Sequence, residues 1–158
     1  MNIVIGCDLM GLKLKDAIKK MLIESGHTVN DVGSYSEEKQ ITHPEAGAAV
    51  AVEIQKGNAD RGILVCGTGM GVAIAANKFK GVYAAVVESE FTARHCRSIN
   101  GCNVLCLGGG FVLGELLGLE ITKEFLSTDF GQGFDKNMKG YLQKLADDIS
   151  NIEAENFK

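Results

Sequence analysis

The chain has 158 residues, 46% of them hydrophobic, and a formal net charge of −4 at pH 7. This length and composition are typical of one folded domain with a sizeable core. Negative charge argues against nucleic acid as the main partner, since binding to the phosphate backbone needs a basic surface. No apolar run reaches the ~18 residues of a membrane span, and the N-terminus lacks the basic segment of a signal peptide. We therefore expect a cytoplasmic protein without a membrane partner.

Five cysteines are spread along the chain without the spacing of a disulfide framework or of a zinc site. In a reducing compartment these thiols are expected to be free, and the sequence indicates no metal and no cofactor. Cys7, Cys102 and Cys106 fall in or beside apolar runs of the strand type, so we expect them in the core.

Strand and helix patterns alternate along the chain. In chain order, the predicted elements are a strand at 2–7, a helix at 12–24, a strand at 28–32, a helix at 45–56 with Pro44 at its start, a strand at 61–66, a helix at 69–78, a strand at 82–87, a helix at 89–98, a strand at 103–107, a helix at 112–126, and one or two helices at 135–157. Strands joined by helices of this length are parallel, with right-handed crossovers. The sequence therefore predicts an α/β fold, a Rossmann-like doubly wound sheet of about five parallel strands, as one domain over residues 1–158.

The segment after the third predicted strand is the most informative for function. It reads Cys66-Gly67-Thr68-Gly69-Met70-Gly71 and lies where ligands bind in such sheets, beyond the carboxyl end of a strand and before a helix. Glycines let the backbone approach a ligand closely, and amide groups at a helix start attract negative charge. A thiol in this position is expected to be reactive, and a thiolate can remove a proton from a carbon beside a carbonyl. Taken alone, however, such a segment more often serves packing or binds nucleotide phosphates, and a cysteine at the end of a strand is usually inert.

Several motifs, in order, make the chain similar to the ribose-5-phosphate isomerase B and galactose-6-phosphate isomerase family. They are Ile5-Gly6-Cys7-Asp8, Asp31-Val32-Gly33-Ser34, Ala59-Asp60-Arg61-Gly62-Ile63-Leu64-Val65-Cys66-Gly67-Thr68-Gly69, Ala75-Ala76-Asn77-Lys78 and Asn103-Val104-Leu105. The resemblance covers about residues 1–133. It implies a sugar or sugar-phosphate isomerase that transfers a proton through a cis-enediol without a metal, as a homodimer or homotetramer with its site at the subunit interface.

The resemblance also implies roles for particular residues. Cys66 would be the base, and Asp8 would bind a sugar hydroxyl. Asn100 matches an asparagine near the substrate carbonyl. The enediolate would be held by Thr68 and by the amides of Gly67, Gly69, Met70 and Gly71.

The chain departs from the family at positions that open the sugar ring or bind phosphate. Leu9 and Ile99 stand where the family has histidines, and His43 replaces a tyrosine. No arginine follows Arg97, so the family's phosphate-binding arginines are missing, and Lys136 and Lys139 are the candidate replacements. These two lysines equally fit the solvated face of a helix.

Leucine and isoleucine cannot protonate a ring oxygen. We therefore expect a substrate that never forms a ring, such as a tetrose phosphate whose O4 is blocked, or else an unphosphorylated sugar.

The sequence also offers other candidate residues and alternative functions. His43 is a candidate acid or base at a helix start, and His95 is a weaker one. His27 is expected to cap a helix or to lie at the surface. Arg94 and Arg97 are expected at the solvated surface, with contact to a substrate or a partner subunit as the alternative. One alternative function is a sugar- or nucleotide-binding module that kept the fold and lost catalysis. A nucleotide-binding domain with a phosphate loop is less consistent, because no Gly-Lys-Ser/Thr motif occurs.

Overall fold

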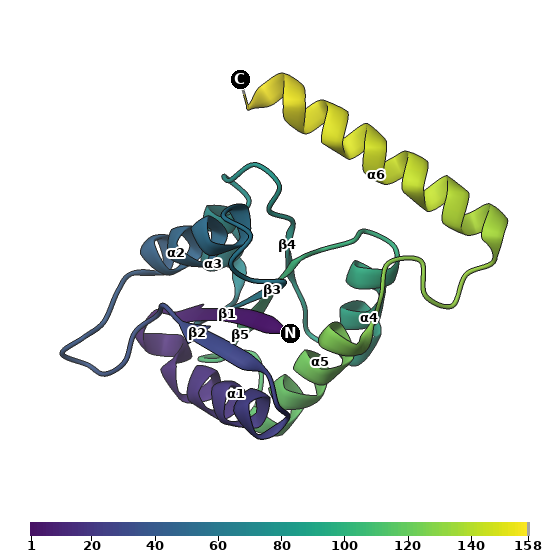
Figure 1. Ribbon diagram of the computed structural model, residues 1–158. Coiled ribbons are helices and arrows are strands. Elements are labelled where there is room, and N and C mark those ends of the chain that lie inside the picture. Colours follow the sequence, from purple (N-terminus) through teal and green to yellow (C-terminus); the bar gives the residue numbers. More distant parts are fainter. Residues whose placement is uncertain (158) are drawn as a thin grey trace.

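The computed structural model of the chain describes residues 1–157 and contains a sheet of five parallel strands (Figure 1). Its strand order is β2-β1-β3-β5-β4. The strands are β1 (Asn2–Cys7), β2 (Thr28–Asp31), β3 (Arg61–Cys66), β4 (Ala84–Val86) and β5 (Val104–Gly108). The helices are the short η1 (Leu9–Gly11), then α1 (Leu12–Glu24), α2 (His43–Gln55), α3 (Met70–Ala76), α4 (Glu90–Ser98), α5 (Glu115–Ser127) and α6 (Lys136–Asn156). This arrangement confirms the predicted α/β fold.

Helices cover both faces of the sheet, and each face has its own hydrophobic core. On one face, α1, α4 and α5 pack against the sheet through residues such as Ile18, Ala93 and Phe125. On the other face, α2 and α3 pack through residues such as Val50 and Val72. The central strands β1, β3 and β5 are largely apolar because both of their faces are covered, which is the usual composition of a parallel sheet.

The observed boundaries differ from the predicted ones where loop contacts decide the structure. Helix α2 begins at His43 rather than at residue 45, because the Thr42 hydroxyl and the Glu45 carboxylate cap its first turn reciprocally. Strand β4 is shorter than the predicted 82–87 because it lies at the edge of the sheet and pairs only with β5. Helix α5 begins at Glu115, three residues later than predicted, because residues 109–113 form a loop bonded to neighbouring segments.

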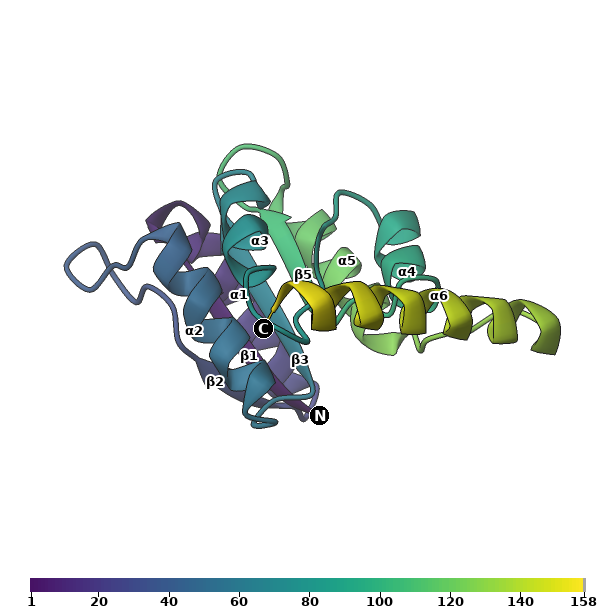
Figure 2. The ribbon, with the colours of Figure 1, turned by 90° about the horizontal axis from the view of Figure 1, so that it is seen from above.

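The tail forms the single 21-residue helix α6, whose first turns project beyond α4 and whose C-terminal end returns to the body (Figure 2). Its far end is tied to the body by Glu153, whose carboxylate accepts hydrogen bonds from Gly81 N at 2.7 Å and from the Tyr83 hydroxyl at 3.2 Å. Leu142 is buried, but a row of apolar side chains along α6 stays exposed, namely Met138, Tyr141, Leu145, Ile149 and Ile152. This helix therefore carries an apolar surface that the rest of the chain does not cover.

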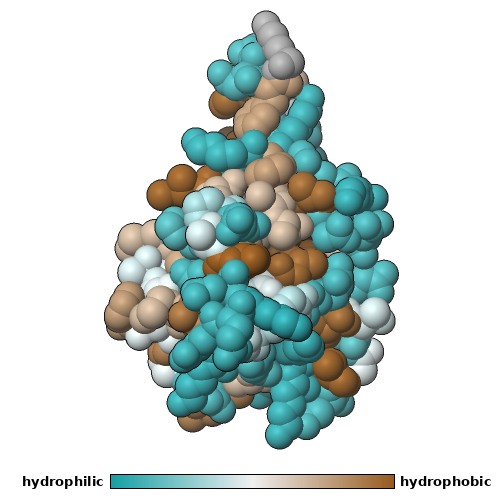
Figure 3. Space-filling model, turned by 90° about the vertical axis from the view of Figure 1, so that its left-hand side faces the viewer, coloured by the Kyte–Doolittle hydropathy of each residue, from teal (hydrophilic) through white to brown (hydrophobic). Residues whose placement is uncertain are grey.

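The side of the molecule that carries α2 and the β2–α2 loop is mainly polar, with smaller apolar areas between the polar groups (Figure 3). Within residues 1–157, no helix combines the length and the apolar composition needed to cross a membrane.

Candidate active site

The loops after β1 and β3 meet at the point where the sheet changes direction. From β1 the chain passes to β2 on one side, and β3 then pairs with β1 on the other side. Asp8 N donates to Val65 O at 3.3 Å, so Asp8 lies next to the residue that precedes Cys66. In open α/β sheets this kind of crevice is where ligands bind.

Cys66 ends β3 and lies in the turn that leads into α3. Its sulfur accepts a hydrogen bond from Gly69 N at 3.1 Å. The turn requires φ of +80° at Gly69, a left-handed conformation that side chains disfavour. The Gly69 amide therefore fixes the sulfur within the turn, at the carboxyl end of β3.

Thr68 completes this turn and is half-buried. Its hydroxyl oxygen accepts a hydrogen bond from Met70 N at 3.3 Å. Two of the amides that the sequence assigns to the enediolate, those of Gly69 and Met70, are thus engaged within the turn itself in this structure. Any substrate oxygen that used them would have to compete with the sulfur of Cys66 or with the hydroxyl of Thr68.

A cleft of about 420 Å³ opens beside this turn. It is lined by Asp8, Leu9, Met10, Gln40, Ile41, Thr42, His43 and Glu45. The imidazole of His43 packs directly on Gly71, where an added methyl group would lie only 2.5 Å from its Cδ2 atom. One oxygen of Asp8 accepts from Gly11 N at 3.0 Å, which fixes the side chain at the start of η1. The structure therefore brings Asp8 and His43 together around the Cys66 turn.

The β5–α5 loop is bonded to the same turn. Gly109 N donates to Cys66 O at 2.9 Å, while Gly110 N and Phe111 N donate to Gly67 O at 3.3 and 3.0 Å. These bonds fix two peptide carbonyls of the turn. They also place the ring of Phe111 over Gly67, where an added methyl group would lie 2.8 Å from the ring.

A buried ion-pair network holds the wall of the cleft, and the sequence analysis did not identify it. The Lys15 side chain is 1% exposed, and its ammonium group donates to Asp31 at 2.8 Å, to Ser34 O at 3.0 Å and pairs with Asp16 at 2.9 Å. The Ser34 hydroxyl in turn accepts from Ile41 N at 3.0 Å. Burial alone would raise the pKa of Asp31, but the ammonium groups of Lys15 and Lys19 lower it below its usual range. The loop that leads to His43 is thus anchored to α1.

Two other buried thiols, those of Cys7 and Cys106, have raised pKa values. Burial raises the pKa of Cys7 to about 12, and burial also holds the pKa of Cys106 well above its usual value. Both stay protonated at neutral pH. Cys7, Cys102 and Cys106 are buried, which confirms the expectation that they belong to the core.

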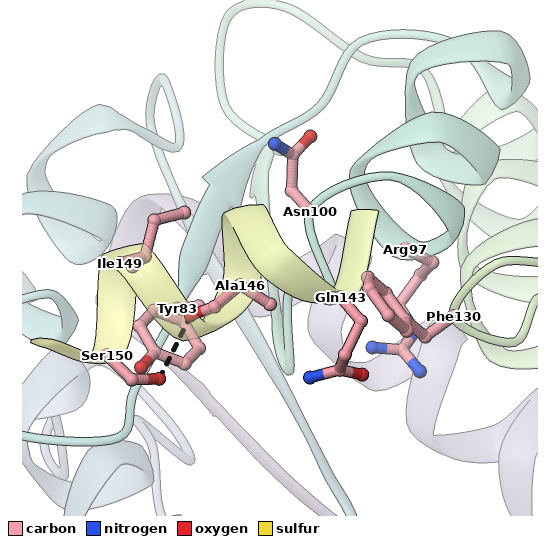
Figure 4. A pocket seen from close by; sticks show the side chains of 9 residues that line it. Tyr83, Arg97, Asn100, Phe130, Gln143, Ala146, Ile149 and Ser150 are labelled. Carbon is pink, nitrogen blue, oxygen red and sulfur yellow. Dashed lines mark hydrogen bonds between the residues drawn. The ribbon is translucent and has the colours of Figure 1, made fainter. Parts of the chain in front are cut away.

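Three predicted site residues lie away from both the Cys66 turn and the cleft. Lys136 and Lys139 are exposed on the first turns of α6. Asn100 lines a separate pocket of about 300 Å³ between α6 and the body, and Figure 4 shows its side chain pointing away from those of Gln143 and Phe130. Within one chain, therefore, these residues are not placed beside Cys66.

The surface position expected for Arg97 is wrong. Its side chain is buried, because its Nη1 donates to Cys102 O at 2.6 Å and its Nε donates to Thr128 O at 3.3 Å. Burial lowers the pKa of Arg97, although a guanidinium keeps its charge at neutral pH. Arg97 ties the end of α4 to the end of α5.

The remaining histidines lie away from the cleft. The His95 ring stacks on Phe91 with centroids 4.1 Å apart, and its Nδ1 lies 2.7 Å from Phe91 O. His27 lies near the amino group of Met1, at 3.4 Å. Only His43 therefore stays a candidate for acid–base chemistry beside the Cys66 turn.

Comparison with known proteins agrees with the fold and the motifs. The pattern of the family described as Ribose/Galactose Isomerase matches residues 3–141. The chain is 40% identical to a 4-deoxy-4-sulfo-D-erythrose isomerase of Clostridium sp. (strain MSTE9), over 97% of this chain and 96% of the relative. It is 37% identical to D-erythrulose-4-phosphate isomerase 2 of Mycolicibacterium smegmatis, over 82% of this chain and 86% of the relative.

The structural comparison leads to the same group. The ribose-5-phosphate isomerase B of Clostridium thermocellum superimposes with a TM-score of 0.89 at 36% identity, over 99% of both chains. The matched region contains the Cys66 turn, the cleft and most of the sheet. The chain therefore belongs to the ribose/galactose isomerase family and is an aldose–ketose isomerase.

Proposed function

We propose that the chain interconverts the aldose and ketose forms of an open-chain, four-carbon sugar with a terminal anionic group, and that Cys66 moves the proton. The observation that carries this proposal is the Cys66 turn, in which the sulfur accepts the Gly69 amide beside a cleft containing Asp8 and His43. The arrangement has the parts that enolisation needs: a base, hydrogen-bond donors and an acid–base partner.

The proton transfer conserves atoms and needs no other reactant. The Cys66 thiolate takes the proton from C2 of the aldose, and the electron pair moves into the C1–C2 bond to give an enediolate. Thr68 and free amides of the turn hold the enediolate oxygen, while His43 exchanges a proton between O1 and O2. The thiol of Cys66 then returns its proton to C1, which gives the ketose and restores the thiolate.

The residues that replace the family's histidines support a substrate without a ring. Leu9 lines the cleft and Ile99 follows α4, and neither can protonate a ring oxygen. A four-carbon sugar whose C4 carries a sulfonate or a phosphate ester has no O4 hydroxyl with which to close a furanose. Two relatives of this chain bear the names of isomerases for such tetroses.

A panel of substrates tests the proposed function. We expect turnover of 4-deoxy-4-sulfoerythrose or erythrulose 4-phosphate to exceed that of ribose 5-phosphate in kcat/KM by about a hundredfold or more, since a missing acid catalyst typically costs that much. Allose 6-phosphate and free erythrose serve as controls for ring size and for the anion. Efficient conversion of ribose 5-phosphate together with inactivity on both anionic tetroses would contradict the proposal.

We further propose that the active unit is a homodimer, or a tetramer built from dimers, in which each site uses residues of two chains. The separation of Asn100 from the Cys66 cleft supports this assembly, because one chain leaves the two predicted site residues apart. The exposed apolar row along α6 offers surface for a second copy. Lys136 and Lys139, at the start of the same helix, would then reach the partner's cleft.

Complementation between two defective variants tests the shared site. Cys66→Ala and Asn100→Ala chains are each expected to be nearly inactive as pure proteins. After co-expression, hybrid dimers contain one site with both changes and one site with neither, so about one quarter of the parent activity is expected. Co-expression of each variant with itself is the control. If the mixture stays as inactive as its components, each site belongs to one chain.

A further inference from the structure

Phe111 is an exposed aromatic side chain fixed at the edge of the candidate active site. Its ring lies over Gly67, the residue after Cys66, and its side chain is 72% exposed. The hydrogen bond from Phe111 N to Gly67 O, together with that from Gly110 N, fixes the backbone that carries the ring. The position of the ring relative to the Cys66 turn is thus set by the fold.

Met10 extends this apolar surface toward the cleft. It lines the cleft beside Asp8, and its side chain is 48% exposed. An added methyl group on Gly110 would lie 3.3 Å from both Cβ and Cε of Met10 and 3.0 Å from the Cα of Gly67. Because Gly110 has no side chain, Met10 can approach the Cys66 turn. The apolar side chains of Met10 and Phe111 therefore both lie next to Gly67.

The charged residues that line the cleft do not favour a phosphate ester. Among the residues that line the cleft are two acids, Asp8 and Glu45, and no lysine or arginine. A phosphate ester carries about −1.5 to −2 charges at neutral pH, and binding it normally uses charge-assisted donors. A sulfonate bonded directly to carbon carries one negative charge and has no bridging ester oxygen. Beside an apolar wall, the sulfonate is therefore the less costly group to remove from water.

We propose that Met10 and Phe111 form the wall that receives the terminal carbon of the substrate, and that Phe111 selects a sulfonate over a phosphate ester at that carbon. This inference rests on the proposed function, since it assumes an anionic tetrose in the Cys66 cleft. The wall contacts the C4 methylene group and supplies no donor to an ester oxygen. A phosphate ester placed there would have an ester oxygen without a hydrogen-bond donor, and it would carry a second negative charge beside the apolar wall.

The test compares two substrates on four proteins. The ratio of kcat/KM for 4-deoxy-4-sulfoerythrulose to that for erythrulose 4-phosphate is measured for the parent, Phe111→Arg, Phe111→Leu and Phe91→Arg. Phe91 is the matched control, because it is equally exposed at 71% and lies on α4. A ratio above one in the parent is expected to fall by about tenfold or more in Phe111→Arg, since one charge-assisted hydrogen bond gives that factor. Phe111→Leu and Phe91→Arg are expected to keep the ratio within about threefold of the parent's.

Each outcome has a separate meaning. A parent that turns over an anionic tetrose but prefers the phosphate, or a ratio that Phe111→Arg leaves unchanged, overturns the role of Phe111 and leaves the proposed function intact. An equal shift in Phe91→Arg also overturns it, because a general change of surface charge would then explain the result. A parent that converts neither tetrose removes the proposed function, and the selectivity of Phe111 with it.

Discussion

Replacing Cys66 by alanine is expected to lower kcat by at least about a hundredfold, the usual contribution of a positioned base. The sulfur ends β3 and accepts the Gly69 amide, and the residues that line the adjacent cleft include no thiol. Cys66→Ser keeps a polar atom at the same place but holds its proton more tightly, so it is expected to be nearly as inactive. Initial rates on the preferred tetrose measure both effects.

Cys96→Ala is the matched control for this substitution. Cys96 lies on α4 and is partly buried, and its sulfur bonds the Ala93 carbonyl rather than anything at the cleft. Its removal is expected to change kcat by less than about threefold. Near-parent activity of Cys66→Ala, with an unchanged melting temperature, would show that another group moves the proton.

Replacing Lys15 by methionine is expected to have the largest effect on stability, a loss of about 3–5 kcal/mol in the free energy of unfolding. The change leaves the Asp31 carboxylate, which is 5% exposed, with only the more exposed Lys19 as its cation. It also removes the donor to Ser34 O that anchors the loop leading to His43. Urea denaturation followed by circular dichroism measures the effect.

Two further variants distinguish the loss of the Lys15 ion-pair network from a general effect of replacing a lysine on α1. Lys20→Met changes the same residue type on the same helix, but Lys20 is 77% exposed and contacts Glu24 only at 4.0 Å, so it is expected to cost less than about 0.5 kcal/mol. Lys15→Met combined with Asp31→Asn removes the unpaired charge and is expected to recover part of the loss. Equal stability of Lys15→Met and Lys20→Met would contradict the assigned role of the network.

The fold could be predicted largely from sequence because its elements follow simple patterns. The apolar run 61–66 is bounded by charged and glycine-rich segments, and it forms β3 with the predicted bounds. The ends of helices and strands were less predictable where contacts between distant segments decide them. The later start of α5, for instance, follows from the bonds that hold the β5–α5 loop to Cys66 and Gly67, and no local pattern records these bonds.

Only part of the candidate site could likewise be predicted from the sequence. The Cys66 turn could be predicted, because a glycine-rich segment after a buried strand has a known structural meaning. The buried position of Lys15 could not, since a lysine next to Leu14 on an amphipathic helix is usually solvated and its partner Asp31 lies on another element. Arg97 was misplaced for a similar reason, because its partners are backbone carbonyls of two other segments. Asn100 and Cys66 lie apart in one chain, which sequence order alone does not reveal.

The most direct test of proton transfer at Cys66 is the fate of the hydrogen on C2 when the reaction runs in heavy water. A thiolate that exchanges its proton with solvent while the enediolate is bound should place deuterium at C1 of the ketose, detectable by nuclear magnetic resonance in the first turnovers. Cys66→Ala should abolish this incorporation along with isomerisation. A Cys66→Ala protein that still forms the ketose at the full rate, with deuterium at C1, would mean that another group exchanges the proton, and the account given for Cys66 would be wrong.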